Sequence, residues 1–554
     1  MCAQRLASDR KCDLTRLRRA WRAAVSVLVV GALAGCASIG EAPAWSPHAG
    51  APAELAITGT SDPASGSGLP TPAPSVDASG IDVRMLYSAN TAAPLAARWG
   101  EIPGNPAFTD LLRGRVTAAI AEQSGLAGAP YTPAADAPDI APENRGCVPG
   151  STTRPVAELL ADPALSAPGE GLRLTITCEI LAAAGTLLVE SLRITTATGD
   201  QITSDQSTVY YADTAGAFVI TSDTFVTDDG LRALLPRLVQ SLKAGAGALD
   251  PAMHQSVDDF PLDQLRTWFS HLAFAPDGAL VVTVPAGFGT PELDALASWR
   301  AGAGADGAHP PFTITVPAAD ATALLSEQGT QVQAVLASGA PLALPAAPTR
   351  AQEQVDCALF ACIALTFDDG PGDYTAQVLD DLDARRAAAT FFLQGYRVAQ
   401  NPGVVVRMHA EGHEIGNHSW NHPDLTKLTD EEIRDQLERT TKAIQDAAGV
   451  RPSTFRPPYG AVDPRVLAQT ELPAILWTID TNDWRIPDDA TLLDRAVQQP
   501  GPGAIVLLHD VHENTARMTP MIVDGLLGRG FTLVTVQQLL GGTLPAPHTT
   551  TSHG

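Results

Sequence analysis

The chain has 554 residues, more than one ordinary domain contains, so we expect two or three folded units. Hydrophobic residues make up 45% of it, which is enough for packed cores and excludes a wholly disordered protein. The net charge of −25, from 36 Lys and Arg against 61 Asp and Glu, repels polyanions and excludes nucleic acid as a partner.

The first 35 residues have the pattern of an export signal. A basic segment, Arg16–Arg22, precedes an apolar stretch, Ala23–Ala34, that is too short to span a bilayer comfortably. The stretch runs into Leu33-Ala34-Gly35-Cys36, which resembles a bacterial lipobox and implies cleavage before Cys36 and lipidation of that residue. Because two acyl chains hold a protein stably on a membrane, we expect a lipid-anchored protein outside the cytoplasmic membrane. A plain secretory peptide with a coincidental cysteine is the alternative.

The seven cysteines divide by position. Cys2 and Cys12 belong to the signal peptide, and Cys36 belongs to the lipidation motif. Four remain in the rest of the chain: Cys147, Cys178, Cys357 and Cys362. An even number in an exported protein predicts two disulfides, and of the three possible pairings sequence proximity favours 147 with 178 and 357 with 362. Free buried thiols are the alternative.

Two linkers set off the middle of the chain. Residues 36–79 are rich in Ala, Pro, Ser and Gly, as in a flexible tether, and residues 341–356 hold three prolines in an Ala-rich stretch. Residues 80–340 carry no catalytic motif. Their alternating and periodic stretches predict strands at Leu172–Cys178, Leu188–Thr195, Thr203–Tyr211, Ala279–Val284 and Phe312–Val316, and a helix at Leu231–Leu242. We expect an α+β accessory region of unknown ligand here, with a mere spacer as the alternative.

From residue 357 the pattern changes to short apolar strands that alternate with amphipathic helices. Strands are expected at Ile363–Phe367, Ala389–Leu393, Ile475–Ile479, Ile505–Leu508 and Thr532–Val536. Helices are expected at Tyr374–Arg386, Pro402–Glu411, Asp430–Ala448 and Met518–Leu527, the third after a capping-box sequence that starts at Thr429. This alternation predicts an α/β domain with a parallel sheet over 357–541, followed by a tail over 542–554. Functional side chains should then lie at the carboxyl ends of the strands.

Five polar motifs occur in order along this domain. They are Thr366–Pro371 (TFDDGP), His418–His422 (HSWNH), Arg456–Tyr459 (RPPY), Asp480–Trp484 (DTNDW) and Leu507–Asp510 (LLHD). Adjacent carboxylates, paired histidines, an arginine and a late histidine are the groups of a metal-assisted hydrolase, which needs ligands, a base for water and an acid for the leaving group. In a helical turn, histidines four residues apart would project both rings toward one ion. Two unrelated surface histidines are the alternative.

This set resembles, motif by motif, the five signature motifs of the NodB-homology polysaccharide deacetylases (carbohydrate esterase family 4). The resemblance covers about a third of the chain. It implies a distorted barrel of the (β/α)7 type and hydrolysis of acetyl groups on a glycan. It also implies one divalent ion, for which Zn²⁺ is the expected metal, with Co²⁺, Ni²⁺ or Mn²⁺ compatible with the ligands.

The resemblance also implies the roles of the first motifs. The metal ligands would be Asp369, His418 and His422, with Asp368 as the base that deprotonates water. Arg456 would hold that base in place. The sequence alone does not distinguish the two neighbouring aspartates.

The later motifs supply the acid and the pocket. His509 would be the acid that protonates the leaving amine, kept charged by Asp483. Tyr459 would offer a backbone N–H to the oxyanion, and Trp484 and Leu507 would wall a slot of acetyl size. An ordinary structural ion pair is the alternative role for Asp483 and for the arginine of the third motif.

We therefore expect a lipid-anchored, metal-dependent polysaccharide N-deacetylase, with peptidoglycan amino sugars as the first-choice substrate because the anchor would place the enzyme beside the wall. Its expected partners are an acetylated glycan, either peptidoglycan or a chitin-like polymer, and the membrane through the lipid alone; the oligomeric state stays open. One alternative is an O-acetyl esterase that acts on xylan or a similar glycan. The other is a binding or sensor lipoprotein whose α/β domain is inert.

Overall fold

The computed structural model describes residues 55–59, 76–88, 90–134, 145–275, 277–303, 309–349, 353–542 and 550–551. The chain divides into two compact units, 1–54 and 55–554, and every described residue belongs to the second. The expected signal peptide, Cys36, and most of the tether and tail lie outside the described residues. In the described part, no helix has the length and apolar character needed to cross a bilayer.

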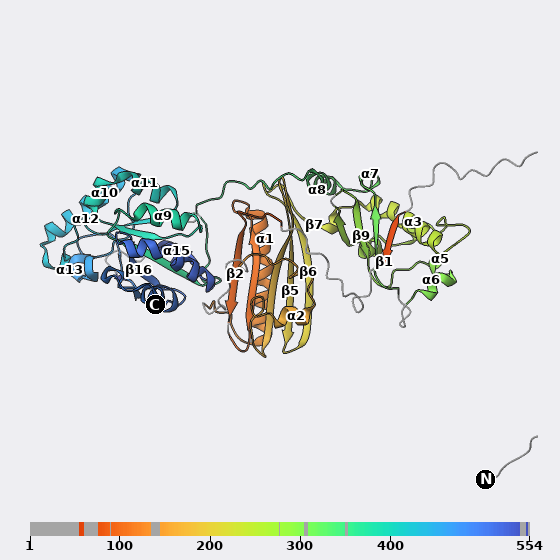
Figure 1. Cartoon of the computed structure of the whole chain (residues 1–554), viewed down its shortest axis with the longest axis horizontal. Coiled ribbons are helices and arrows are strands. Elements are labelled where there is room, and N and C mark those ends of the chain that lie inside the picture. The colour runs from red at the N-terminus through yellow and green to blue at the C-terminus, as the bar shows by residue number, and fades with distance from the viewer. Residues whose placement is uncertain are drawn as a thin grey trace, which may run out of the picture. The chain divides into compact units, whose positions relative to one another are not determined.

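The first half of the accessory region contains a six-stranded sheet in the order β2-β3-β4-β5-β6-β7 (Figure 1). The strands are β2 (Asp82–Ser88), β3 (Leu95–Glu101), β4 (Leu172–Ala184), β5 (Leu187–Thr198), β6 (Gln201–Asp213) and β7 (Val219–Thr221). Neighbouring strands are antiparallel except β3 and β4, which are parallel. Helix α1 (Pro106–Ala127) lies along this sheet and buries Phe108 and Leu112; α2 (Val156–Ala161) is a short helix of the loop before β4. The three strands expected between residues 172 and 211 are all present and are longer than predicted.

The second half of the accessory region contains an antiparallel sheet in the order β1-β10-β9-β8. Its strands are β1 (Ala56–Gly59), β8 (His271–Phe274), β9 (Leu280–Val284) and β10 (Phe312–Val316). The helices of this part are α3 (Asp228–Gly245), α4 (Leu262–Trp268), α5 (Pro291–Asp294), α6 (Ala297–Ala301), α7 (Ala318–Ala321) and α8 (Glu327–Ser338). Helix α3 is the amphipathic helix that the sequence predicts, and it begins at the N-cap Thr227.

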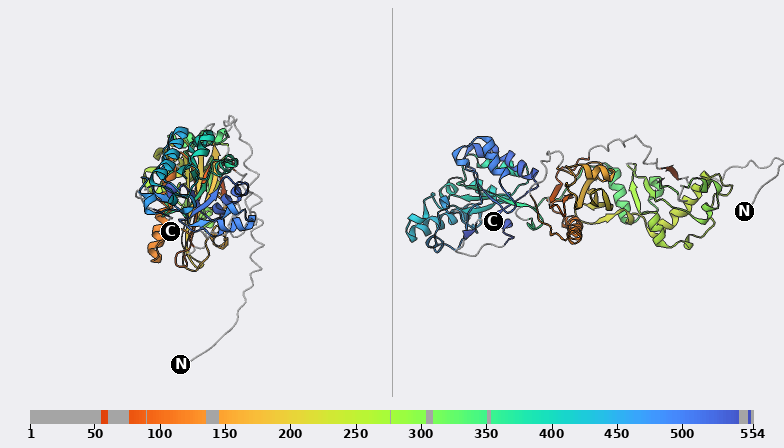
Figure 2. Two further views of the ribbon diagram at one scale, coloured as in Figure 1. Left: turned by 90° about the vertical axis from the view of Figure 1, so that its left-hand side faces the viewer. Right: turned by 90° about the horizontal axis from the view of Figure 1, so that it is seen from below.

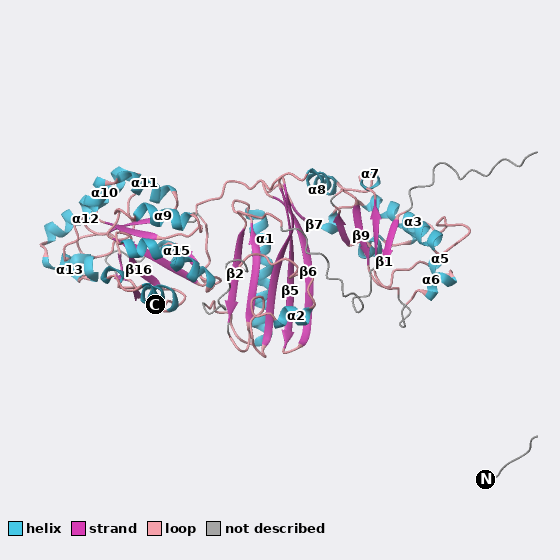
Figure 3. Cartoon of the chain, viewed as in Figure 1, coloured by secondary structure: helices cyan, strands magenta, loops and turns pink. Residues whose placement is uncertain are grey.

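The carboxy-terminal domain is built on a parallel sheet in the order β13-β12-β11-β16-β15. Figure 3 shows its strands in magenta among cyan helices. Its strands are β11 (Cys362–Asp368), β12 (Thr390–Leu393), β13 (Glu414–Asn417), β15 (Ile479–Asp480), β16 (Ile505–His509) and β17 (Thr532–Val534), the last of which pairs with the first half of β11. A separate two-stranded pair joins β14 (Ala474–Ile475) to β18 (Thr550–Thr551). The mixed α/β content with parallel strands is as predicted, whereas closure into a barrel stays a prediction.

Helices surround this sheet in the views of Figures 1 and 2. They are α9 (Thr375–Asp383), α10 (Gly395–Gln400), α11 (Pro402–Ala410), α12 (Asp430–Ala448), α13 (Pro464–Leu467), α14 (Asp489–Leu493), α15 (Glu513–Gly528) and α16 (Val536–Leu539). The core between helices and sheet is apolar, and it includes Ile363, Leu365 and Phe367 of β11, none of which is exposed. The capping box predicted for α12 is confirmed, since Thr429 and Glu432 exchange side-chain to backbone hydrogen bonds.

Two predicted strands are wrong in extent. The strand expected over Thr532–Val536 ends at Val534, and Val536 begins helix α16. Instead of a continuous strand over Ile475–Ile479, the chain makes two short strands, β14 and β15, with an irregular segment between them. The cause is Arg456, whose Nε donates to Ile475 O at 3.0 Å and whose Nη2 donates to Leu476 O at 3.1 Å. Those two carbonyls therefore face the guanidinium rather than a neighbouring strand.

Both predicted cysteine pairs are bonded. Cys147 is linked to Cys178 in β4, and Cys357 is linked to Cys362, the first residue of β11. This is the pairing that sequence proximity favours.

Ile486 has an unusual backbone conformation. Its φ of 51° and ψ of 60° are left-handed, a region that β-branched residues rarely adopt, and its side chain is 70% exposed. Since this conformation costs an L-residue about 1–2 kcal/mol and asparagine tolerates it better, Ile486→Asn is expected to raise the free energy of unfolding by about 1 kcal/mol. Urea titration measures the change. Val406→Asn on α11, a half-exposed control, should not raise the free energy of unfolding. An Ile486→Asn protein that is no more stable than wild type would show that the backbone at Ile486 is not strained.

Candidate active site

The carboxyl edge of the parallel sheet gathers the motif residues. Asp368 is the last residue of β11 and His509 is the last residue of β16, and the two are paired in register on neighbouring strands. Asp483 follows the end of β15 by three residues. In open α/β sheets, ligands bind at this edge, so the position itself indicates a functional site.

Asp368 is held by a fully buried arginine. Arg456 Nη1 lies 2.8 Å from Asp368 Oδ1 and also donates to Thr366 Oγ1 at 2.7 Å, and neither the guanidinium nor the carboxylate has more than 4% of its surface exposed. The other oxygen, Asp368 Oδ2, lies 3.7 Å from His418 Nε2. One oxygen is thus fixed by the arginine, while the other faces the His418 ring.

Asp369, His418 and His422 form a cluster. Both His418 Nε2 and His422 Nε2 lie 3.5 Å from Asp369 Oδ1, and one ligating atom from each residue lies within 4.8 Å of the others. His418 Nδ1 is 2.6 Å from the Arg456 carbonyl, and since a carbonyl only accepts, Nδ1 is the donor and Nε2 is the ring nitrogen directed at Asp369.

The protonation states also suit an ion. Burial and the neighbouring His418 lower the pKa of His422, which favours the neutral ring that ligation needs. Burial raises the pKa of Asp369, but the two imidazoles and a hydrogen bond from Gln394 outweigh it, so this pKa lies below its ordinary value. Two imidazoles and a carboxylate that is ionised at neutral pH therefore fit a divalent metal such as Zn²⁺.

The helical turn expected for the histidine pair is wrong. His418 and His422 stand on a loop after β13, and Ser419 and His422 both have a φ of 64°. The loop is held by side chains: Asn417 Oδ1 accepts from Ser419 N at 2.8 Å, and Gln436 Oε1 accepts from Trp420 N at 2.8 Å. Left-handed residues, rather than helical periodicity, turn both rings toward Asp369.

His509 is paired with Asp483. Nδ1 of the ring lies 2.8 Å from Asp483 Oδ1, and the backbone N–H of His509 donates to Oδ2 at 2.7 Å. Thr515 Oγ1 donates to the same oxygen at 2.6 Å, so the buried carboxylate is fully bonded. Burial lowers the pKa of His509, but Asp483 outweighs it and raises that pKa to about 9. The ring is therefore protonated at neutral pH, with Nε2 as its remaining N–H.

The three residues expected to form the pocket differ in exposure. Tyr459 is 70% exposed with a φ of 62°, and its ring lies edge-on to His422 at 4.5 Å between centroids. Trp484 is 47% exposed beside Asp483, whereas Leu507 is buried within β16, two residues before the acid. Tyr459 thus lies against His422 of the Asp369–His418–His422 cluster, and the roles of all three in substrate contact stay predictions.

Two buried polar residues without a predicted role contact the first motif: Gln394, which the sequence analysis missed, and Asp510, the last residue of the fifth motif. Gln394, at the end of β12, donates from Nε2 to Asp369 Oδ1 at 2.5 Å. Asp510 is fully buried against Gly370, where a Cβ would lie 2.6 Å from the Asp510 carboxylate, so only glycine fits. Burial raises the pKa of Asp510 to about 7. Gln394 directly follows an apolar strand, and this position was the signal that could have revealed it.

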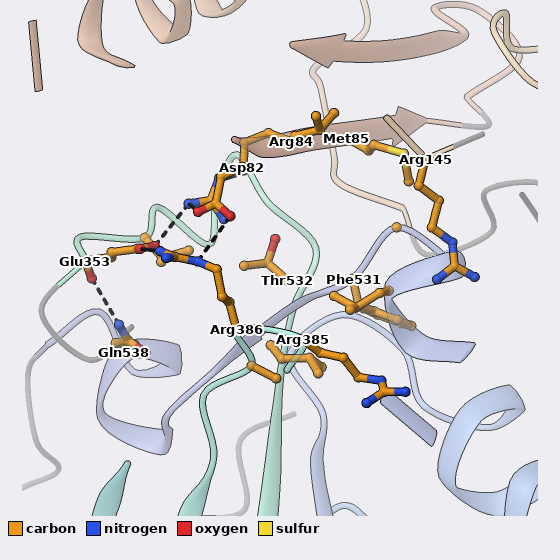
Figure 4. Close-up of a pocket in the computed structure, with 16 residues that line it drawn as sticks. Asp82, Arg84, Met85, Arg145, Glu353, Arg385, Arg386, Phe531, Thr532 and Gln538 are labelled. Carbon is orange, nitrogen blue, oxygen red and sulfur yellow. Dashed lines mark hydrogen bonds and ion pairs between the residues drawn. The ribbon is translucent and has the colours of Figure 1, made fainter. Parts of the chain in front are cut away.

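Figure 4 shows a pocket elsewhere in residues 55–554. Charged residues line it, and they pair with one another: Arg84 and Arg386 each contact both Asp82 and Glu353. None of the motif residues lines this pocket, so it is not part of the candidate site.

A parallel sheet that carries a candidate ligand cluster, a held carboxylate and a charged imidazole at its carboxyl edge has the groups that metal-assisted hydrolysis needs. Residues 357–474 match the family model described as polysaccharide deacetylase. A chitooligosaccharide deacetylase of Bradyrhizobium is 36% identical over 196 residues, which are 32% of this chain and 90% of that relative. The chain belongs to the polysaccharide deacetylase family.

Two further relatives match about the same share of the chain. The peptidoglycan-N-acetylglucosamine deacetylase PgdA of Listeria monocytogenes is 44% identical over 183 residues, 33% of this chain and 39% of the relative. The peptidoglycan-N-acetylmuramic acid deacetylase PdaC of Bacillus subtilis is 42% identical over 178 residues, 32% of this chain and 38% of the relative. The match thus spans about two fifths of the length of each of these two proteins.

Proposed function

We propose that this protein hydrolyses N-acetyl groups of a cell-wall polysaccharide, with the amino sugars of peptidoglycan as the substrate, and that the reaction depends on a divalent ion. The observation that carries the proposal is the meeting of the Asp369–His418–His422 cluster with two proton-handling groups, Asp368 and His509, at one sheet edge. Two relatives named as peptidoglycan deacetylases support this choice of substrate.

The ion would be held by Asp369, His418 and His422, and when bound it would supply Lewis-acid polarisation of the amide carbonyl and of the attacking water. Zn²⁺ is the metal that the proposal favours. Asp368 Oδ2, the oxygen that faces the imidazoles, accepts a proton from the attacking water. The arginine on Oδ1 keeps that carboxylate oriented, with Oδ2 left free to take the proton.

His509 completes the reaction. As the C–N bond breaks, Nε2 of His509 donates its proton to the departing nitrogen, and the products are acetate and a free amine on the sugar. Asp483 stabilises the charged ring before that transfer. The backbone N–H of Tyr459 would stabilise the oxyanion, and Trp484 and Leu507 would bound the space for the acetyl methyl group.

The location of the enzyme is part of the proposal. A lipid on Cys36 would hold the chain outside the cytoplasmic membrane, where peptidoglycan is within reach of a tethered domain. The lipobox-like sequence supports this, and mass spectrometry of the membrane fraction tests it through the mass of the lipidated amino terminus.

Product analysis of wall glycan tests the activity. Purified peptidoglycan incubated with the protein and Zn²⁺ should yield acetate and an equal amount of new free amine on glucosamine or muramic acid. Acetate without new amine, released from acetylated xylan instead, would replace the proposal with the esterase alternative. If neither polymer releases acetate, the proposal is wrong, and the alternative of a non-catalytic wall-binding protein takes its place.

The pH profile tests the acid. Because Asp483 raises the pKa of His509 to about 9, kcat should stay high at neutral pH and fall as the pH rises through 9. Asp483→Asn removes that charge, so the pKa should move down toward its ordinary value of about 6.5 and the alkaline limb should move with it. The measurement is kcat for acetate release between pH 6 and pH 10.

Asp480→Asn is the matched control, because Asp480, the last residue of β15, lies three residues before Asp483 and its side chain accepts from the Asn482 N–H rather than from the imidazole. Asp480→Asn should leave the alkaline limb of the pH profile at the same pH as in wild type. An unshifted limb in Asp483→Asn would show that His509 is not the titrating acid.

A further inference from the structure

The segment that follows β12 connects the two loops that carry the metal cluster. On one side, Gln394 N donates to Gly370 O at 3.1 Å, directly after Asp369. On the other side, Leu393 O accepts from His418 N at 2.9 Å and Gly395 N donates to the loop at 3.0 Å. Gln394 is thus the residue of this segment that binds the aspartate turn, while its two neighbours bind the histidine loop.

The side chain of Gln394 binds the same turn a second time. Its Nε2 donates to Asp369 Oδ1, the oxygen that lies 3.5 Å from Nε2 of both His418 and His422. Only 6% of Gln394 is exposed, so water does not readily replace this bond. The amide therefore fixes the carboxylate at the centre of the ligand cluster.

The chemistry of the donor suits this task. Asp369 has a φ of 72°, so its turn is not held by a regular helix or strand, and without a partner its carboxylate could rotate away from the imidazoles. An amide N–H occupies one lone pair and carries no charge, so the carboxylate keeps its full attraction for a cation. A lysine or arginine at this position would orient the group but cancel that charge.

We propose that Gln394 is a positioning residue that sets the affinity of the Asp369–His418–His422 site for its divalent ion. The inference rests on the metal site of the proposed function, and it concerns a residue outside all five motifs. Partners of metal ligands typically contribute about 10–100-fold to metal affinity, which is the size of effect expected here.

The test compares two variants of the full chain. Gln394→Met keeps the volume and removes the donor, and calorimetric titration of the metal-stripped protein should show Zn²⁺ binding about 10–100-fold weaker than in wild type. Excess Zn²⁺ should then restore most of the kcat, because the ligands themselves remain. Gln394→Leu, which also lacks the donor and adds no charge, should weaken binding to a similar extent, and it serves where the methionine variant does not fold.

Gln333→Met is the matched control. Gln333 is 8% exposed and donates from Nε2 to Gly278 O at 2.6 Å, but it lies in the accessory region. Its loss should lower the melting temperature without changing Zn²⁺ affinity. Wild-type affinity in both Gln394 variants, or an equal loss in the control, would overturn the inference.

The proposed function fails in a different way. Wild-type protein that binds Zn²⁺ but releases no acetate would refute the deacetylase and leave the role of Gln394 intact. Wild-type protein that binds no Zn²⁺ would refute both the site and the inference.

Discussion

Replacing Asp368 by asparagine is expected to lower kcat/KM for acetate release by about 10²–10⁴-fold. The asparagine has nearly the same shape but cannot accept a proton from water at Oδ2, the oxygen directed toward the imidazoles. The loss should appear in kcat rather than in KM, because the substrate still meets the same groups. The measurement is steady-state acetate release from an acetylated chito-oligomer at saturating Zn²⁺.

A second effect must be separated from the first. Arg456 is fully buried against Asp368, and removing the charged partner of a buried ion pair costs up to about 3–5 kcal/mol of stability. The folded fraction is therefore measured by urea titration before turnover is compared. Asp373→Asn, an exposed position five residues further on, should behave as wild type in both measurements. A folded Asp368→Asn protein with wild-type turnover would disprove the assigned base.

Replacing His418 by alanine is expected to weaken Zn²⁺ binding by at least about 100-fold, since it removes a ligand outright rather than its partner. The ring is buried and is fixed through Nδ1 to the Arg456 carbonyl, so no neighbouring group can move in to replace Nε2. At ordinary metal concentrations, the rate of acetate release should fall in proportion to the fraction of protein that holds Zn²⁺. Calorimetric titration of the metal-stripped protein gives the affinity, and acetate release gives the turnover.

The control is His409→Ala on α11, because that histidine is exposed and lies outside the cluster. It should leave both quantities unchanged. Chelator treatment of wild type should also abolish turnover, and added Zn²⁺ should restore it. A His418→Ala protein that binds Zn²⁺ as tightly as wild type would remove the metal site from the proposal.

The parts of the site that depend on strand ends could be predicted from the sequence. Asp368 and His509 each follow an apolar run that becomes a parallel strand, and the carboxyl ends of such strands meet at one edge. The disulfide pairing followed from proximity in the chain, and the start of α12 followed from its capping box.

The parts that depend on long-range partners could not be predicted. The histidine loop is shaped by left-handed residues and by Gln436, 16 positions after the tryptophan whose N–H it accepts, and spacing within the motif carries no information about either. The break between β14 and β15 arises because Arg456, from another motif, donates hydrogen bonds to the backbone carbonyls of Ile475 and Leu476. Gln394 belongs to no motif; its position directly after an apolar strand points to the site edge, but its contact with Asp369 is visible only in the fold.

The pairing of Asp368 with His509 across β11 and β16 has a geometric consequence for the substrate. Adjacent strands stand about 4.8 Å apart. The distance between the proposed base, Asp368, and the proposed acid, His509, is therefore set by the spacing of the two strands. In the proposed reaction, an acetamide would bridge that distance with its carbonyl carbon between the two groups, whatever sugar carries it. Choice among glycans therefore falls to the surrounding loops, and exchanging those loops between family members should alter polymer preference while leaving the bond cleaved the same.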